Sequence, residues 1–138
     1  MKSVSLVEAE YTAHQLAREL MDYGEPVADF NTRYPGKLEG CLEAPFTHIN
    51  GRYVYWTLAH RAAVLFYSII KNHPFENGNK RMAVTITLVF VFKNDRWIDI
   101  SPEDLYKIAT VVAKSRPIDH DEVIKTLKIT FKQNLSEA

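Results

Sequence analysis

Two long apolar segments joined by a short polar stretch constrain this sequence more than any other feature. The first covers residues 58–71 (LAHRAAVLFYSIIK) and the second covers residues 81–95 (RMAVTITLVFVFKND). Apolar side chains in the first segment cover more than one stripe of a helix, which is typical of a central helix. The second is rich in β-branched residues, but its length favours a buried helix over a strand. We therefore expect two buried helices connected by residues 73–81.

Other segments show apolar residues at helical spacing or helix-start signals. They are residues 6–22, about 38–42, 102 to about 114, and 119 or 120 to 132. Gly24 and Pro26 are expected to end the first of these helices, and Ser101 is expected to cap the third. Thr57 is expected to cap the apolar helix over residues 58–71. Residues 93–96 are expected to form a solvated turn.

Residues 45–56 (PFTHINGRYVYW) predict a β-hairpin. Asn50 and Gly51 both tolerate the positive φ of a type I′ turn. Aromatic and β-branched residues lie on both sides of that turn, as in strands. Together the patterns predict an all-α fold with a small β-hairpin, in a single domain spanning residues 1–138. Arg61 falls in the apolar helix that follows and is expected to extend its charge to the surface.

Charge and cysteine content exclude several classes of protein. Lys and Arg number 17, as do Asp and Glu, so the formal net charge is zero and nothing indicates nucleic-acid binding. Cys41 is the only cysteine, so no intrachain disulfide forms. The N-terminal segment contains acids where a signal peptide would be apolar, and no segment is long enough to span a membrane. A cytoplasmic location without membrane contact is expected.

The stretch HPFENGNKR, residues 73–81, contains more charged and hydrogen-bonding side chains than a turn requires. A helix starting near Gly78 and Asn79 would present unpaired N–H groups to an anion, and phosphate is the usual guest. Lys80 and Arg81 in its first turn oppose the helix dipole, which indicates a role other than helix stability. The pattern therefore suggests a phosphate cradle.

Two further groups fit a nucleotide site. His73, just before the loop, is placed to accept a proton from a hydroxyl nucleophile. Asn77 or Glu76 is a candidate Mg²⁺ ligand, and Phe75 is expected to anchor the loop in the core. For a generic stretch of this composition, an ordinary polar turn is the more common explanation. The first Gly and the final Ser/Thr of a Walker A loop are missing.

HPFENGNKR resembles the signature of the Fic/Doc superfamily, His-x-Phe-x-(Asp/Glu)-Gly-Asn-x-Arg. Residues 36–46 and 49–63 also resemble the Leu-Glu-x-x-Leu-x-x-Pro segment and the β-hairpin flap of that family, so the resemblance covers about residues 36–95. It implies a Fic-fold helical bundle that uses ATP and Mg²⁺.

The resemblance also implies residue roles. His73 would be the general base, Phe75 would pack beneath the loop, and Gly78 and Asn79 would line the phosphate site. Arg81 would neutralise phosphate charge. The flap would dock a protein target by strand addition; its docking residues are Thr47, His48, Ile49, Asn50, Gly51 and Arg52.

Three positions depart from the AMP-transferring members of the family. Lys80 stands where those enzymes usually have Gly, and Val84 stands where they usually have Arg. Lysine at the first position is the pattern of the death-on-curing (Doc) branch, in which the nucleotide is reversed and the γ-phosphate is transferred. Asn77 replaces the metal-binding Asp/Glu, so it would be a weaker Mg²⁺ ligand.

The resemblance to the Doc branch implies a toxin of a toxin–antitoxin pair. The sequence contains no self-inhibitory Ser/Thr-x-x-x-Glu-Gly/Asn string, so inhibition would come in trans from a separate antitoxin. The target would be translation elongation factor Tu. Two alternatives stay open: an AMP transferase that tolerates Lys80, and a nucleotide- or protein-binding module in which Asn77 has weakened metal-dependent activity.

Overall fold

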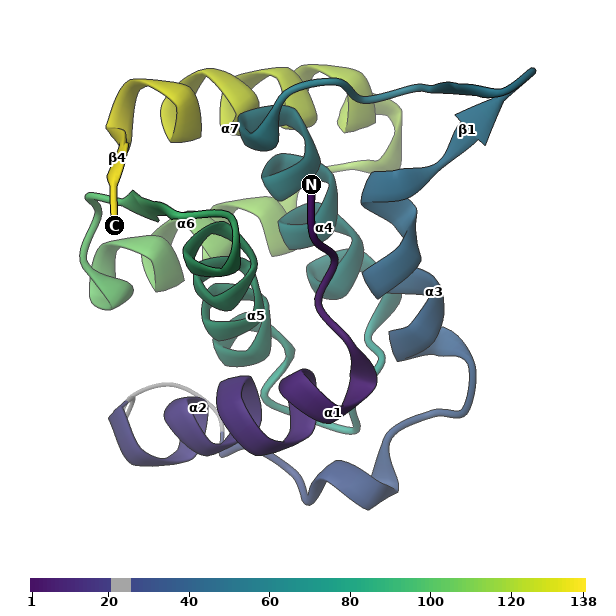
Figure 1. Cartoon of the computed structure of the whole chain (residues 1–138). Coiled ribbons are helices and arrows are strands. Elements are labelled where there is room, and N and C mark those ends of the chain that lie inside the picture. The colour runs from purple at the N-terminus through teal and green to yellow at the C-terminus, as the bar shows by residue number, and fades with distance from the viewer. Residues whose placement is uncertain (21–25) are drawn as a thin grey trace.

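The centre of the fold is a pair of apolar helices. The computed structural model describes residues 1–20 and 26–138. Helix α4 spans Leu58–Asn72 and helix α5 spans Asn79–Lys93, and the two pack against each other in the middle of the bundle (Figure 1). Both helices were predicted from the sequence, and the strand alternative for the second segment is wrong.

The remaining helices cover this pair. Helix α7 (His120–Asn134) packs on α4, α6 (Pro102–Lys114) contacts both central helices, and α3 (Lys37–Glu43) contacts α4. Short 3₁₀ turns connect them at Phe30–Thr32, Ala44–Phe46 and Pro117–Asp119. The result is the predicted all-α bundle with a small β component.

The predicted first helix forms, but with an irregular middle. It consists of α1 (Leu6–Glu8), a π-helical turn η1 (Ala9–His14) and α2 (Gln15–Leu20). These three pieces form one rod lying across one end of α5 (Figure 1). The last two residues predicted for this helix, and the helix-ending role of Gly24, fall outside the described residues.

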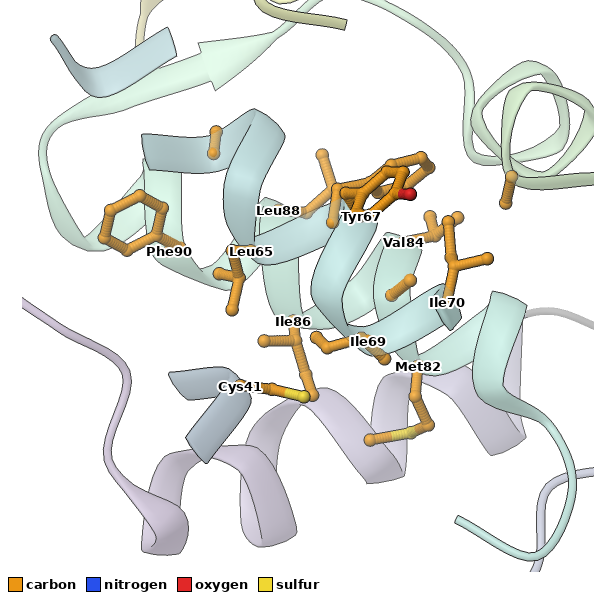
Figure 2. Close-up of a cluster of buried hydrophobic side chains, with 14 of the residues drawn as sticks. Cys41, Leu65, Tyr67, Ile69, Ile70, Met82, Val84, Ile86, Leu88 and Phe90 are labelled. Atoms are coloured by element: carbon orange, nitrogen blue, oxygen red, sulfur yellow. The ribbon is translucent and has the colours of Figure 1, made fainter. Parts of the chain in front are cut away.

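The core is built mainly from the side chains that α4 and α5 present to each other. Figure 2 shows Leu65, Ile69 and Ile70 of α4 interleaved with Met82 and Ile86 of α5. All five side chains are buried. Burial of an aliphatic side chain contributes about 1.5–3 kcal/mol, so this interface holds the loop between the two helices in a fixed position.

Local signals correctly marked the helix starts. The Thr57 hydroxyl accepts a hydrogen bond from the His60 backbone N–H at 3.1 Å, and Ser101 does the same for Asp104 at 3.1 Å. Each side chain satisfies one of the N–H groups that the first turn leaves without a helical partner.

The predicted hairpin is present and projects away from the helices (Figure 1). Strand β1 (His48–Ile49) pairs antiparallel with β2 (Arg52–Tyr53), with His48 opposite Tyr53 and Ile49 opposite Arg52. Asn50 and Gly51 have φ values of 52° and 77°, as the type I′ prediction requires. We refer to residues 45–56 as the flap hairpin.

A second small sheet was not predicted. Strand β3 (Arg96–Ile98) pairs antiparallel with β4 (Leu135–Glu137), so the predicted solvated turn ends at Asp95 and residue 96 already belongs to a strand. Each strand has only three residues, which is too short to show an alternating apolar pattern, and the two lie far apart in the chain. The sequence therefore contains no signal for them. Within the described residues, no helix combines the length and apolarity that crossing a bilayer requires.

Candidate active site

The loop between α4 and α5, residues 73–81, lies where the sequence predicted it; we call it the motif loop. His73 ends α4 with φ of 49°, a left-handed conformation that is uncommon outside glycine and concentrated at functional sites. Its side chain is exposed. Helix α5 begins at Asn79, directly after Gly78. An exposed imidazole therefore stands across a short loop from a helix N-terminus.

Asn79 ties the two sides of the motif loop together. Its Oδ1 accepts a hydrogen bond from the Phe75 backbone N–H at 2.9 Å, and its Nδ2 donates to the Phe75 carbonyl at 3.0 Å. Because the N–H requires an oxygen and the carbonyl requires a donor, these bonds orient the amide. Nδ2 also lies 3.5 Å from Nδ1 of His73. That separation is longer than a typical hydrogen bond. It shows where the His73 ring lies, but it does not determine which ring nitrogen carries the proton.

Phe75 anchors the motif loop as expected. Its side chain is only 1% exposed, and its ring lies 5.8 Å from that of Phe30 in a tilted arrangement. Next to it, the Pro74 carbonyl accepts a hydrogen bond from the Tyr34 N–H at 2.9 Å. The loop is therefore fixed both by its own asparagine and by the irregular segment before α3.

The close approach of residues 26–27 to the motif loop requires a glycine at position 78. Its φ is +76°, and a Cβ built there would lie 2.8 Å from the Cα of Val27 and 3.0 Å from the carbonyl oxygen of Pro26. Residues 26–27 therefore occupy the space beside its Cα. The resemblance places Gly78 in the phosphate site, and that role stays a prediction.

Lys80 and Arg81 occupy the first turn of α5, but their environments differ. The Lys80 ammonium lies 6.0 Å from the ring centre of Tyr106 on α6, and its side chain is half-buried. Arg81 is 7% exposed, and its guanidinium donates to the Ala17 carbonyl of α2. Together with Gly78 and Tyr106, the two cations line a small recess that leaves no room for a water molecule. Positive charge is thus concentrated at the helix end that already favours anions.

Asn77 provides one oxygen that fits a metal ion. Its side-chain Oδ1 is buried and makes no hydrogen bond. A buried polar atom without a partner destabilises the folded state unless a ligand bonds to it. Glu76, the other candidate, is exposed. Across the described residues no cluster of three His, Cys, Asp or Glu side chains exists. One unpartnered oxygen is compatible with an ion such as Mg²⁺, which commonly binds few protein oxygens together with substrate phosphates and water, but it does not by itself make a metal site.

The flap residues predicted to dock a target are all exposed. Thr47 donates to the Ala44 carbonyl at 2.8 Å and so fixes the start of β1. The other five lie in the two strands and their turn; they are His48, Ile49, Asn50, Gly51 and Arg52. A short ladder with open outer edges can accept a further strand.

Two contributing residues were not predicted. Tyr106 lies on α6 and reaches Lys80 only through the tertiary fold, so no sequence pattern points to it. Arg61 was expected to reach the surface, and this expectation is wrong because its side chain is only 5% exposed. Its Nε donates to the Tyr55 carbonyl at 2.8 Å, which ties the flap hairpin to α4.

The comparisons with known proteins point in one direction. A family model described as "Fic/DOC family" matches residues 8–91, which is more than half of the chain. The matched range contains the flap hairpin, α4, the motif loop and most of α5. No curated protein and no solved structure matches the chain.

Proposed function

Because this chain belongs to the Fic/DOC family, generally one of nucleotidyl- and phosphotransferases, we propose that it transfers the γ-phosphate of ATP to a hydroxyl group of a protein. One observation carries the proposal. The side chain of Asn79 holds together the loop that joins exposed His73 to the cationic first turn of α5. Phosphoryl transfer requires positioning and charge neutralisation more than covalent chemistry, and this arrangement supplies both.

In this proposal, the imidazole of His73 takes the proton of the attacking hydroxyl as its oxygen bonds to the γ-phosphorus. The bond from that phosphorus to the bridging oxygen breaks, and ADP leaves. Lys80 and Arg81 neutralise charge on the phosphates, assisted by Gly78 and Asn79 at the helix N-terminus. Mg²⁺, held in part by Asn77, would supply further charge neutralisation when bound.

Lys80 favours γ-phosphate transfer over AMP transfer. The side chain is half-buried at the first turn of α5 and shares a small recess with Gly78 and Arg81. A glycine at this position would leave the space taken by the lysine side chain to the phosphates of a nucleotide. Val84 is buried and apolar, so it contributes no charge to an α-phosphate. AMP transfer remains the second candidate, and a binding module with little catalysis is the third.

The proposed biological role is that of a Doc-like toxin. The target would be translation elongation factor Tu, docked along the flap hairpin, and inhibition would come from a separate antitoxin in trans. The exposed open edges of β1 and β2 support the docking mode. Neither docking nor transfer requires nucleic acid or a membrane.

Labelled nucleotide separates the three candidates. Purified protein is incubated with elongation factor Tu, Mg²⁺ and ATP labelled at either the γ- or the α-phosphate. We expect label on the target from γ-labelled ATP only. Label from α-labelled ATP would establish AMP transfer instead, and absence of both would favour the binding module.

Asn77→Asp is expected to increase transfer at low Mg²⁺. A carboxylate replaces the unpartnered amide oxygen with a charged ligand of nearly the same shape. We expect the Mg²⁺ concentration for half-maximal transfer to fall about tenfold, equivalent to roughly 1.4 kcal/mol. The measurement is initial rate against Mg²⁺ concentration. Glu76→Gln is the matched control, because Glu76 is exposed, and an equal effect there would contradict the role of Asn77.

A further inference from the structure

A shallow, open hollow runs along the flap hairpin from its turn to α4. It is lined by Gly51, Arg52, Tyr53, Trp56 and Arg61 and has a volume of about 460 Å³. Its rim is exposed: Trp56 is 75% and Tyr53 51% exposed. The Trp56 indole N–H donates to the Tyr53 carbonyl at 2.7 Å, so the aromatic wall is held in place. We call this feature the flap hollow.

Arg61 places a buried positive charge behind the flap hollow. Its guanidinium carbon lies 4.6 Å from the ring centre of Tyr53 and 4.8 Å from that of Phe46. These ring faces attract the cation without neutralising it. Among the described residues, no carboxylate lies within ion-pair distance of Arg61 or of Arg52. The second guanidinium, Arg52, is exposed at the edge.

The surrounding sequence adds no negative charge. Residues 45–61 contain two arginines and two histidines but no Asp or Glu, although the whole chain has zero net charge. Lys128 of α7 also acts on this region, because burial and the Lys128 charge both lower the pKa of His60. The flap hairpin and the start of α4 therefore carry only positive formal charges, although Glu39 and Glu43 lie near Phe46 and His48.

We propose that the flap hollow binds a carboxylate side chain of an extended peptide segment that adds as a third strand to the flap hairpin. The inference deepens the proposed function, on which it rests, by assigning an acidic segment to the docked part of the protein target. Main-chain hydrogen bonds give such docking its affinity, and side-chain pockets give it specificity. The carboxylate pairs with Arg52 and lies in the field of Arg61, while Tyr53 and Trp56 cover its aliphatic stem.

Peptide binding tests the inference without any transfer reaction. The probes are two fluorescent short peptides of alternating Thr and Val that differ only in a central Glu or Gln. Fluorescence anisotropy with the full chain is expected to show about fivefold tighter binding of the Glu peptide, as for an exposed ion pair. The preference should disappear at high salt, because screening weakens exposed pairs.

Charge variants locate the site. Arg52→Gln is expected to remove most of the preference for Glu, and Arg52→Glu is expected to reverse it. Lys132→Gln makes the same charge change near the end of α7 and should leave the preference intact. Equal binding of both peptides, an unchanged preference in Arg52→Gln, or tighter binding of a single-stranded oligonucleotide would each overturn the inference.

The outcome is independent of the labelling experiment. Charge-selective peptide binding without phosphate transfer would retain the acidic-segment inference and reject the proposed enzyme. Transfer to the target with no charge preference in peptide binding would retain the enzyme and reject the inference.

Discussion

Replacing His73 with Ala is expected to reduce γ-phosphate transfer by about 10²–10⁴-fold, the usual contribution of a positioned general base. The side chain is exposed and lies outside the core, so the variant should keep its fold. The cationic turn of α5 is unchanged, and nucleotide binding should therefore persist. The measurements are the single-turnover rate of transfer and the affinity for ATP, on the same preparation.

The backbone at position 73 calls for a second variant. His73 has φ of 49°, which Ala tolerates poorly and Asn tolerates well. His73→Asn should therefore lose transfer to the same extent while conserving the end of α4. Full transfer in both variants would reject the assignment of His73 as the base. Loss in His73→Ala alone would assign the effect to the backbone.

Phe75→Ala is expected to lower the free energy of unfolding by about 3–5 kcal/mol, as for other large-to-small changes of buried aromatic residues. The ring is almost completely buried and contacts Phe30, which precedes α3. Its removal leaves a cavity beneath the motif loop. Urea denaturation followed by circular dichroism measures the change. Transfer should fall as well, because the loop loses its attachment to the core.

Phe92 provides the matched control for this prediction. It lies near the end of α5 and is 62% exposed, so Phe92→Ala should change the free energy of unfolding by less than about 0.5 kcal/mol. Phe75→Leu keeps most of the apolar volume and should fall between the two. If Phe75→Ala were as stable as Phe92→Ala, the anchoring role of Phe75 would be refuted.

Features set by neighbouring residues were predictable from the sequence. The caps at Thr57 and Ser101 are local, because each hydroxyl accepts a hydrogen bond from the backbone N–H only three residues later. The hairpin turn depends only on the tolerance of Asn50 and Gly51 for positive φ. The start of α5 at Asn79 follows from the glycine before it and the apolar run after it. For the same reason, the sequence located the motif loop correctly.

Features that depend on distant segments were not predictable. Strand β3 exists because the C-terminal residues pair with it, and β4 is equally short. An arginine in an apolar helix ordinarily reaches solvent, but Phe46 and Tyr53 of the flap hairpin cover Arg61. Residues 26–27 reach Gly78 only through the chain's tertiary path. For β3 and Gly78 the deciding partner lies far away in the sequence, and for Arg61 it lies 8 and 15 residues earlier, in a different element.

The contact between Arg81 and Ala17 affects how genetic data on this protein should be interpreted. Under the proposed function, a random screen for loss of transfer would recover Arg81 substitutions whether or not its guanidinium touches phosphate, because each one also removes a hydrogen bond between α5 and α2. The frequency with which Arg81 substitutions are recovered therefore does not show whether its guanidinium contacts phosphate. Lys80, which has no such backbone attachment among the described residues, is the more informative position for assigning loss of function to the nucleotide.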